Sequence, residues 1–196
     1  MSPAGVHLTL FVAFLRAINV GGHNAVKKEK LQEIFVSLSF TNVSVYKQSG
    51  NVIFETPLTD TDAIPKKIQK ELSKILDSDI GVFVREMSHL NKIVESNPFK
   101  GANAEGASFL VTFMSSQPSG FTLPLRIPSS RAEVILIRGH EAYSVTHGHG
   151  EGGKPNPFLE SKFKTQATTR NLNILREIVN AYSKQTIRPN AFSRRV

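Results

Sequence analysis

The stretch that decides the fold is Val43-Ser44-Val45-Tyr46-Lys47-Gln48-Ser49-Gly50-Asn51-Val52-Ile53-Phe54. Its two arms are rich in β-branched and aromatic residues, which is typical of strands. The Ser-Gly-Asn sequence between the arms favours a tight turn, because glycine and asparagine tolerate the backbone angles that turns need. The stretch therefore predicts a β-hairpin in the first half of the chain.

Strands and helices are predicted on both sides of this hairpin from the spacing of apolar residues. The predicted elements are a strand over 7–15, a helix over 26–38, a helix capped by Thr61 or Asp62 that ends near Leu76, and a strand over 80–84. With the hairpin, the order is strand, helix, strand, strand, helix, strand. This order predicts a ferredoxin-like α/β plait, the split βαβ arrangement.

The second half of the chain has the pattern of a further α/β unit. Its predicted elements are a helix over 88–96, a strand over 109–114, an irregular segment over 117–130 with at most one helical turn, a hairpin of strands 134–137 and 142–146, a helix capped by Asn156 and opened by Pro157, and a final helix from about Thr169. We predict an α+β protein of two ferredoxin-like α/β-plait domains with mainly antiparallel sheets. Their boundaries are residues 1–86 and 87–182, followed by a basic tail over 183–196.

Composition excludes several classes of site and protein. The chain has 196 residues, of which 40% are hydrophobic and 20% charged, as in an ordinary soluble globular protein. Cysteine is absent, so disulfides, thiolate metal sites and a cysteine nucleophile are excluded. The longest apolar stretch, Leu8–Leu15, is too short to span a bilayer, and no signal-peptide pattern surrounds it. We therefore predict a cytoplasmic protein without a membrane partner.

The net charge of +8 and the pI near 9.8 permit binding to nucleic acid or another polyanion. The alternative is that these cations only solvate helix faces. Lys27-Lys28-Lys30 and Lys66-Lys67-Lys70-Lys74 fit such faces. Both interpretations stay open on the sequence.

Two polar turns, residues 16–24 after the first strand and residues 48–51 in the hairpin, are predicted to meet at one edge of the first sheet. In a plait the first and second strands run parallel, so the end of the first strand lies beside the turn of the hairpin. Glycine N–H groups and the start of a helix suit an acidic group of a ligand, to which an arginine adds a forked contact. The predicted ligand-binding residues are Arg16, Asn19, Gly21, Gly22, Gln48, Ser49 and Asn51, completed by Arg170 and Asn171 of the polar segment Thr168–Asn173.

Each of these motifs also has a purely structural interpretation. The glycines serve tight turns in that case, and Ser49-Gly50-Asn51 is ordinary hairpin chemistry. The segment Thr168–Asn173, predicted as a helix start, fastens the two domains together instead of binding an anion.

Other candidate chemistry is weaker. The sequence Gly148-His149-Gly150-Glu151-Gly152-Gly153-Lys154 has the spacing of a phosphate loop, but Pro155 stands where the magnesium-binding hydroxyl belongs. His147, His149 and Glu151 would share one face of an extended strand, yet the interleaved glycines favour a surface loop. We predict no metal and no cofactor. His23 is the plausible general base beside the first loop.

The ordered motifs resemble a bacterial domain-of-unknown-function family, number 1697. The matching stretches are Leu15–Gly22, Gln48–Phe54, Asn97-Pro98-Phe99 and Thr168–Asn173. The resemblance implies two α/β-plait domains and no particular activity. This sequence departs from the family pattern at Ala17, which is usually glycine, at Leu172, which is usually tryptophan, and in the Gly- and His-rich stretch Gly148–Gly153.

The leading hypothesis is therefore recognition of an anionic ligand, either a nucleotide-like metabolite or a nucleic acid, at the edge formed by 16–24 and 48–51. One alternative is an enzyme that acts on a small polar substrate at this edge, with His23 as acid–base. Another is a structural or interaction module in which the motifs hold the two halves together.

Overall fold

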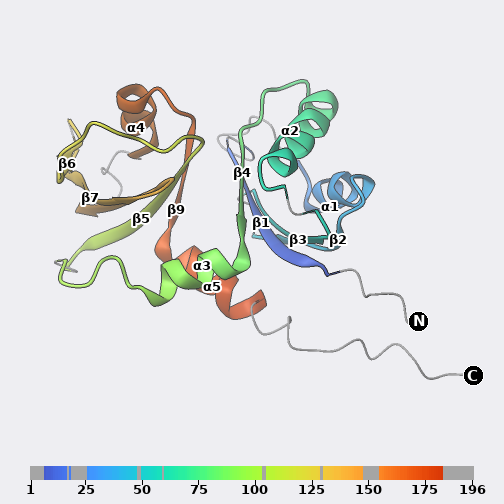
Figure 1. The fold of residues 1–196 in the computed structure, drawn as a ribbon, viewed down its shortest axis with the longest axis horizontal. Helices are drawn as coiled ribbons and strands as arrows, with labels where there is room; N and C mark the ends of the chain where they lie inside the picture. Colours follow the sequence, from blue (N-terminus) through green and yellow to red (C-terminus); the bar gives the residue numbers. More distant parts are fainter. Residues whose placement is uncertain are drawn as a thin grey trace, which may run out of the picture.

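The computed structural model describes residues 7–16, 18, 26–47, 50–58, 60–102, 105–128, 130–147 and 155–182. Within these ranges the chain is a mixed α/β structure with two antiparallel sheets and five helices (Figure 1). The predicted mixture of helices with antiparallel sheets is confirmed.

The first sheet is built by the first half of the chain. Its elements are β1 (Thr9–Leu15), α1 (Lys28–Ser37), β2 (Thr41–Tyr46), β3 (Asn51–Thr56), α2 (Ala63–Leu76) and β4 (Val82–Glu86). The strand order is β2-β3-β1-β4, and every neighbouring pair is antiparallel. Because β1 and β2 both run antiparallel to β3, they run parallel to each other. The end of β1 therefore lies beside the turn between β2 and β3.

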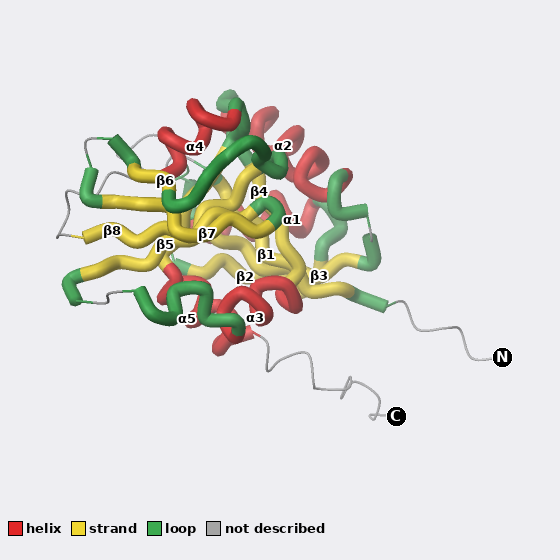
Figure 2. The backbone as a smooth tube through the Cα atoms, turned by 60° about the vertical axis from the view of Figure 1, so that its left-hand side comes forward, coloured by secondary structure: helices red, strands yellow, loops and turns green. Residues whose placement is uncertain are grey.

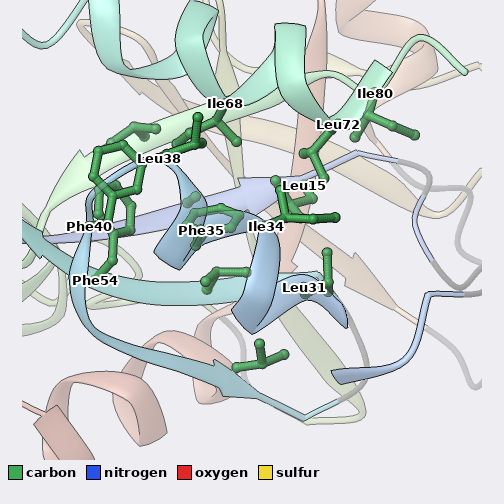
Figure 3. Close-up of a cluster of buried hydrophobic side chains, with 14 of the residues drawn as sticks. Leu15, Leu31, Ile34, Phe35, Leu38, Phe40, Phe54, Ile68, Leu72 and Ile80 are labelled. Carbon is green, nitrogen blue, oxygen red and sulfur yellow. The ribbon is translucent and has the colours of Figure 1, made fainter. Parts of the chain in front are cut away.

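Helices α1 and α2 cover one face of this sheet (Figure 1). Their buried residues recur at helical spacing, so each helix presents one apolar stripe to the strands. Figure 3 shows this core, in which the Phe40 ring stacks on the Phe54 ring with centroids 4.5 Å apart. Burial of this apolar surface is the main force that holds the two helices on the sheet.

The second sheet is built by the second half of the chain. Its elements are α3 (Met87–Glu95), β5 (Ala107–Met114), β6 (Leu125–Arg126), β7 (Ala132–Arg138), β8 (Glu141–His147), α4 (Pro155–Phe163), β9 (Ala167–Asn171) and α5 (Leu172–Tyr182). The strand order is β6-β7-β8-β5-β9, again antiparallel throughout. Helix α4 packs on one face, where buried Leu159 meets the strands.

A shared apolar layer joins the two sheets. Helices α3 and α5 lie side by side at one end of the two sheets, at the bottom of both views (Figures 1 and 2). Residues of both sheets and both helices form one buried cluster. Within it, Phe14 of β1 stacks on Phe113 of β5, with ring centroids 4.4 Å apart and planes inclined by 13°. The two sheets are therefore packed directly against each other.

Four local predictions need correction or refinement. The final helix begins at Leu172, not near Thr169, because Thr168–Asn171 pairs with β5 as an edge strand, in keeping with the strand preference of threonine. Asp62 is the N-cap residue of α2, as predicted, but its side chain makes no capping bond, and Asp60 Oδ1 accepts the N–H groups of Asp62 and Ala63 instead. Helix α4 begins at Pro155, two residues before the predicted first residue, Pro157. The described part of 117–130 is mostly irregular, as predicted, but it contains the short strand β6, which was not predicted.

Candidate functional site

Arg170 joins the two sheets at the edge where the polar turns were predicted to meet. It lies on β9, and its side chain crosses to the end of β1 and the start of β3. Its Nε donates to Asn51 Oδ1 at 2.7 Å, and its Nη2 donates to the carbonyl oxygen of Leu15 at 3.0 Å and that of Gly50 at 3.5 Å. One guanidinium therefore touches both the end of β1, which precedes the first predicted turn, and the end of the hairpin turn.

The rest of this guanidinium is bonded within its own strand. Its Nη1 donates to Thr168 Oγ1 at 2.8 Å and to the carbonyl oxygen of Thr169 at 2.9 Å, and its central carbon lies 5.4 Å from the centre of the Phe14 ring. Part of the residue still reaches the surface, but burial lowers the pKa of Arg170 to about 10. These contacts offset the cost of removing the guanidinium from water.

Gly50 is the residue that lets the hairpin turn approach the end of β1. The N–H of Leu15 donates to its carbonyl oxygen at 2.7 Å. Its φ is +67°, and a Cβ there would lie 3.1 Å from both Cβ and the carbonyl oxygen of Leu15. A side chain would be strained by the backbone angle and crowded by Leu15. The glycine of the hairpin is therefore required for contact between the hairpin turn and the end of β1.

Arg16 lies directly after β1 and pairs with Glu160 of α4. Its Nη2 donates to Oε2 at 3.1 Å, and its Nε lies 3.1 Å from Oε1. The arginine side chain is 38% exposed and the glutamate side chain 20%. This two-point contact uses one side of the guanidinium. We call Arg16, Gly50, Asn51, Glu160 and Arg170 together the arginine rim.

The structure brings three of the predicted site residues together and uses a fourth elsewhere. Arg16, Asn51 and Arg170 belong to the arginine rim. Asn171 ends β9 and caps α5, because its Oδ1 accepts the N–H of Asn173 at 2.9 Å. The other predicted site residues lie outside the described ranges, and these are Asn19, Gly21, Gly22, Gln48 and Ser49.

The weaker candidates fall mostly outside the described ranges as well. His23 and the glycine-rich stretch 148–154 lie outside the described residues. Of the three residues considered as metal ligands, only His147 is described, and it is the last residue of β8. The described residues contain no group of three or more side chains suited to hold a metal ion. Among them, no helix has the length and apolarity that crossing a membrane would need.

A second charged cluster joins the sheets away from the rim. Nε of Arg85 on β4 lies 2.6 Å from Oε1 of Glu141 on β8, and Nε2 of His89 on α3 lies 3.3 Å from Oε2. Burial raises the pKa of Glu141, but the hydrogen bond from His89 and the charge of Arg85 outweigh it, so the pKa lies below its ordinary value. Burial, and then the Glu141 charge, raise the pKa of neighbouring Tyr143 to about 12.

Sequence reasoning missed Glu160 and the cluster around Glu141. Glu160 is 144 residues away from Arg16 along the chain, and no local pattern links a pair so far apart. The charge of Arg85 inside an apolar strand was the available signal, because a charge in a buried strand needs a partner.

Comparison with known protein families identifies the family of this chain. A family model described as a protein of unknown function (DUF1697) matches residues 8–143, which include Arg16, Asn51, Arg85 and Glu141. The chain belongs to this family. The match does not reach Glu160 and Arg170, which complete the rim. No curated protein matches the chain significantly.

A solved structure shares the fold. It is the conserved bacterial protein SP0830 from Streptococcus pneumoniae, which is 18% identical in sequence with a TM-score of 0.63. The alignment covers 89% of this chain and 98% of that one. At this identity the likeness extends to the fold alone.

Proposed function

We propose that the arginine rim binds a small anionic ligand, such as a nucleotide-like metabolite. The observation that carries this proposal is that Glu160 engages only one side of the Arg16 guanidinium. Glu160 occupies one side of its guanidinium, while Nη1 has no partner among the described residues and the side chain is 38% exposed. An arginine fork of this kind matches two oxygens of one phosphate or carboxylate group.

Arg170 supports the site without being its main ligand contact. Its donors hold Leu15, Gly50 and Asn51, so it fixes the residue before the first turn and the end of the hairpin turn. Its positive charge, placed behind the carbonyl oxygen of Leu15, also favours an anion at the rim.

The distribution of charge favours a small ligand over a nucleic acid. Four cations of the last fourteen residues, Lys184, Arg188, Arg194 and Arg195, supply half of the net charge of +8. The remaining +4 is spread over 182 residues, which is modest for a surface that tracks a phosphate backbone.

The test is titration with adenosine monophosphate and with inorganic phosphate at low ionic strength, followed by thermal unfolding and by NMR. We expect Arg16→Gln to weaken binding about tenfold, because a charged hydrogen-bonded contact is lost. The matched control is Arg138→Gln, which removes the exposed arginine that ends β7 and lies outside the rim. Wild-type protein that binds neither probe, or an Arg16 variant that binds as wild type does, contradicts the proposal.

A single-stranded oligonucleotide is the third ligand in this titration. Tight binding that falls steeply with salt would favour the nucleic-acid alternative, because phosphate contacts release counterions. Weak binding without a steep salt dependence supports the small ligand.

We also propose that the chain comprises two ferredoxin-like domains, residues 1–86 and 87–182. Support comes from strand order: β7-β8-β5-β9 repeats β2-β3-β1-β4, with α4 in the place of α2. The second unit departs from the plait between β5 and β7, where β6 and irregular chain replace a helix. The Arg16–Glu160 pair then lies across the domain boundary, as does Arg170.

A further inference from the structure

We infer that Glu160 is a positioning residue that orients the guanidinium of Arg16 toward the ligand. This inference rests on the proposed function and assigns a role to the acidic partner of the arginine. It also predicts an effect opposite to simple charge repulsion: removing the negative charge of Glu160 beside the site is expected to weaken anion binding.

The stem of Arg16 is held on β1 and the neighbouring chain. Its N–H donates to the carbonyl oxygen of Gly81 at 2.8 Å. A Cβ at position 81 would lie 3.2 Å from Cβ and 3.3 Å from Cδ of Arg16, so glycine leaves room for the aliphatic stem. The stem therefore leaves β1 in a defined direction.

The head of Arg16 is held by Glu160 at two atoms, Nη2 and Nε. Glu160 is itself anchored, because its Oε1 accepts the N–H of Ala167, the first residue of β9, at 2.8 Å. It is also the less exposed partner, at 20% against 38%. The carboxylate is thus the fixed member of the pair, and it sets the plane of the guanidinium.

The fixed plane determines what the free side of the guanidinium can bind. With Nε and one Nη2 hydrogen directed to Glu160, the remaining hydrogens on Nη1 and Nη2 point away from it in the same plane. This end of the fork suits two oxygens of one acid group, as in a phosphate or carboxylate. A long side chain that is already ordered loses less conformational entropy when the ligand binds.

Two effects of Glu160 on anion binding have opposite signs. Its charge repels an anion, whereas its hold on Arg16 removes the cost of ordering the guanidinium. Immobilising such a side chain costs enough to change affinity about two- to tenfold. Repulsion by Glu160 is weakened because Arg16 lies between the carboxylate and the ligand and neutralises its charge. We therefore expect the ordering of Arg16 by Glu160 to outweigh the repulsion of the anion by Glu160.

The experiment measures binding of inorganic phosphate by NMR to wild type, Glu160→Ala, Glu160→Gln and Arg16→Lys. Glu160→Ala is expected to bind about two- to tenfold more weakly than wild type, and Glu160→Gln to lie between them. Glutamine keeps the acceptor for Ala167 but loses the charge, so it guards against a loss of folding. Arg16→Lys keeps the positive charge without the fork, and is expected to lose most of the affinity. Arg138→Gln is again the neutral control.

A spectroscopic readout separates positioning from a merely structural role. The Nε–H resonance of Arg16 is expected to be sharp and protected from exchange in wild type and to broaden in Glu160→Ala, while backbone amide shifts outside the rim stay unchanged.

The outcomes distinguish this inference from the proposed function. If wild type binds phosphate and both Glu160 variants bind it equally or more tightly, the positioning role is wrong and the proposed function stands. If wild type itself does not bind, the proposed function fails, whatever the Nε–H resonance reports. Weaker binding with a broadened resonance in Glu160→Ala supports both.

Discussion

Two arginine–glutamate pairs join the same two sheets, yet their surroundings differ. In the Arg16–Glu160 pair, the arginine is 38% exposed and the glutamate 20%. In the Arg85–Glu141 pair, these values fall to 18% and 5%, and His89 adds a second partner to the carboxylate. The arginine–glutamate pair is therefore partly open to solvent at the rim and largely buried in the cluster around Glu141.

A stacked pair of phenylalanine rings connects the two clusters. Arg170 lies over Phe14 at 5.4 Å, Phe14 stacks on Phe113, and Arg85 lies over Phe113 at 5.4 Å. Cation–π contacts of this kind strengthen when water is excluded. The comparison teaches that arginine has two uses in this protein. Arg85 and Arg170 fasten the sheets through the apolar layer, and Arg16 keeps one side of its guanidinium for solvent or ligand.

The largest effect is expected from Arg170→Ala. The substitution removes the hydrogen bonds to Leu15, Gly50 and Asn51 and leaves their buried oxygens without this donor. We expect a loss of about 3 kcal/mol in the free energy of unfolding, measured with urea. Arg176→Ala, on α5, is the control and should cost well under 1 kcal/mol. A loss below 1 kcal/mol for Arg170→Ala would mean that the rim does not fasten the sheets.

The cluster around Glu141 is tested by Glu141→Gln, which keeps the shape of the side chain and removes its charge. We expect a loss of about 2 kcal/mol at pH 7, because Arg85 loses its buried partner. The folded-state pKa of Glu141 is depressed, so its contribution is complete above the carboxyl pKa of the unfolded chain and disappears as the pH falls through the lower folded value. Urea unfolding between pH 7 and pH 3 should show wild type and variant converging. A constant difference across this range would contradict the assignment.

The smallest effect is expected from Arg16→Gln. A half-exposed pair contributes little to stability in water, so the variant should lose about 0.5 kcal/mol, and less in high salt. Urea unfolding at two salt concentrations measures this effect. A loss as large as that of Glu141→Gln would show that the rim pair is a fastening like the other, and would remove the contrast between the two clusters.

Much of the first sheet was predictable from the sequence because its signals are local. Alternating and continuous apolar runs predicted all four strands, and the Ser49-Gly50-Asn51 turn predicted the hairpin. The predicted start of the last helix was wrong because pairing with β5 overrides any local cap signal at Thr168. The strand order of the first sheet followed from the order of the elements.

The candidate site was predictable only in part. Co-location of the two turns follows from topology, and the bond from Leu15 to Gly50 agrees with it. The roles of the arginines did not follow, because they depend on side chains reaching across the two sheets. Nothing near Arg16 in the sequence points to Glu160, and nothing near Arg170 points to the carbonyl of Leu15.

The sequence by itself determined the hairpin and the helices that cover it, since these depend on backbone preference and apolar periodicity over a few residues. Its composition excluded thiol chemistry, and the order of its elements predicted that the end of β1 lies beside the hairpin turn. Only the tertiary structure decided which arginine is enclosed and which keeps an open fork. That outcome depends on how the two sheets pack through α3, α5 and the Phe14–Phe113 pair. Packing between distant segments sets the burial and the partners of a charge, and these in turn set what the charge can bind.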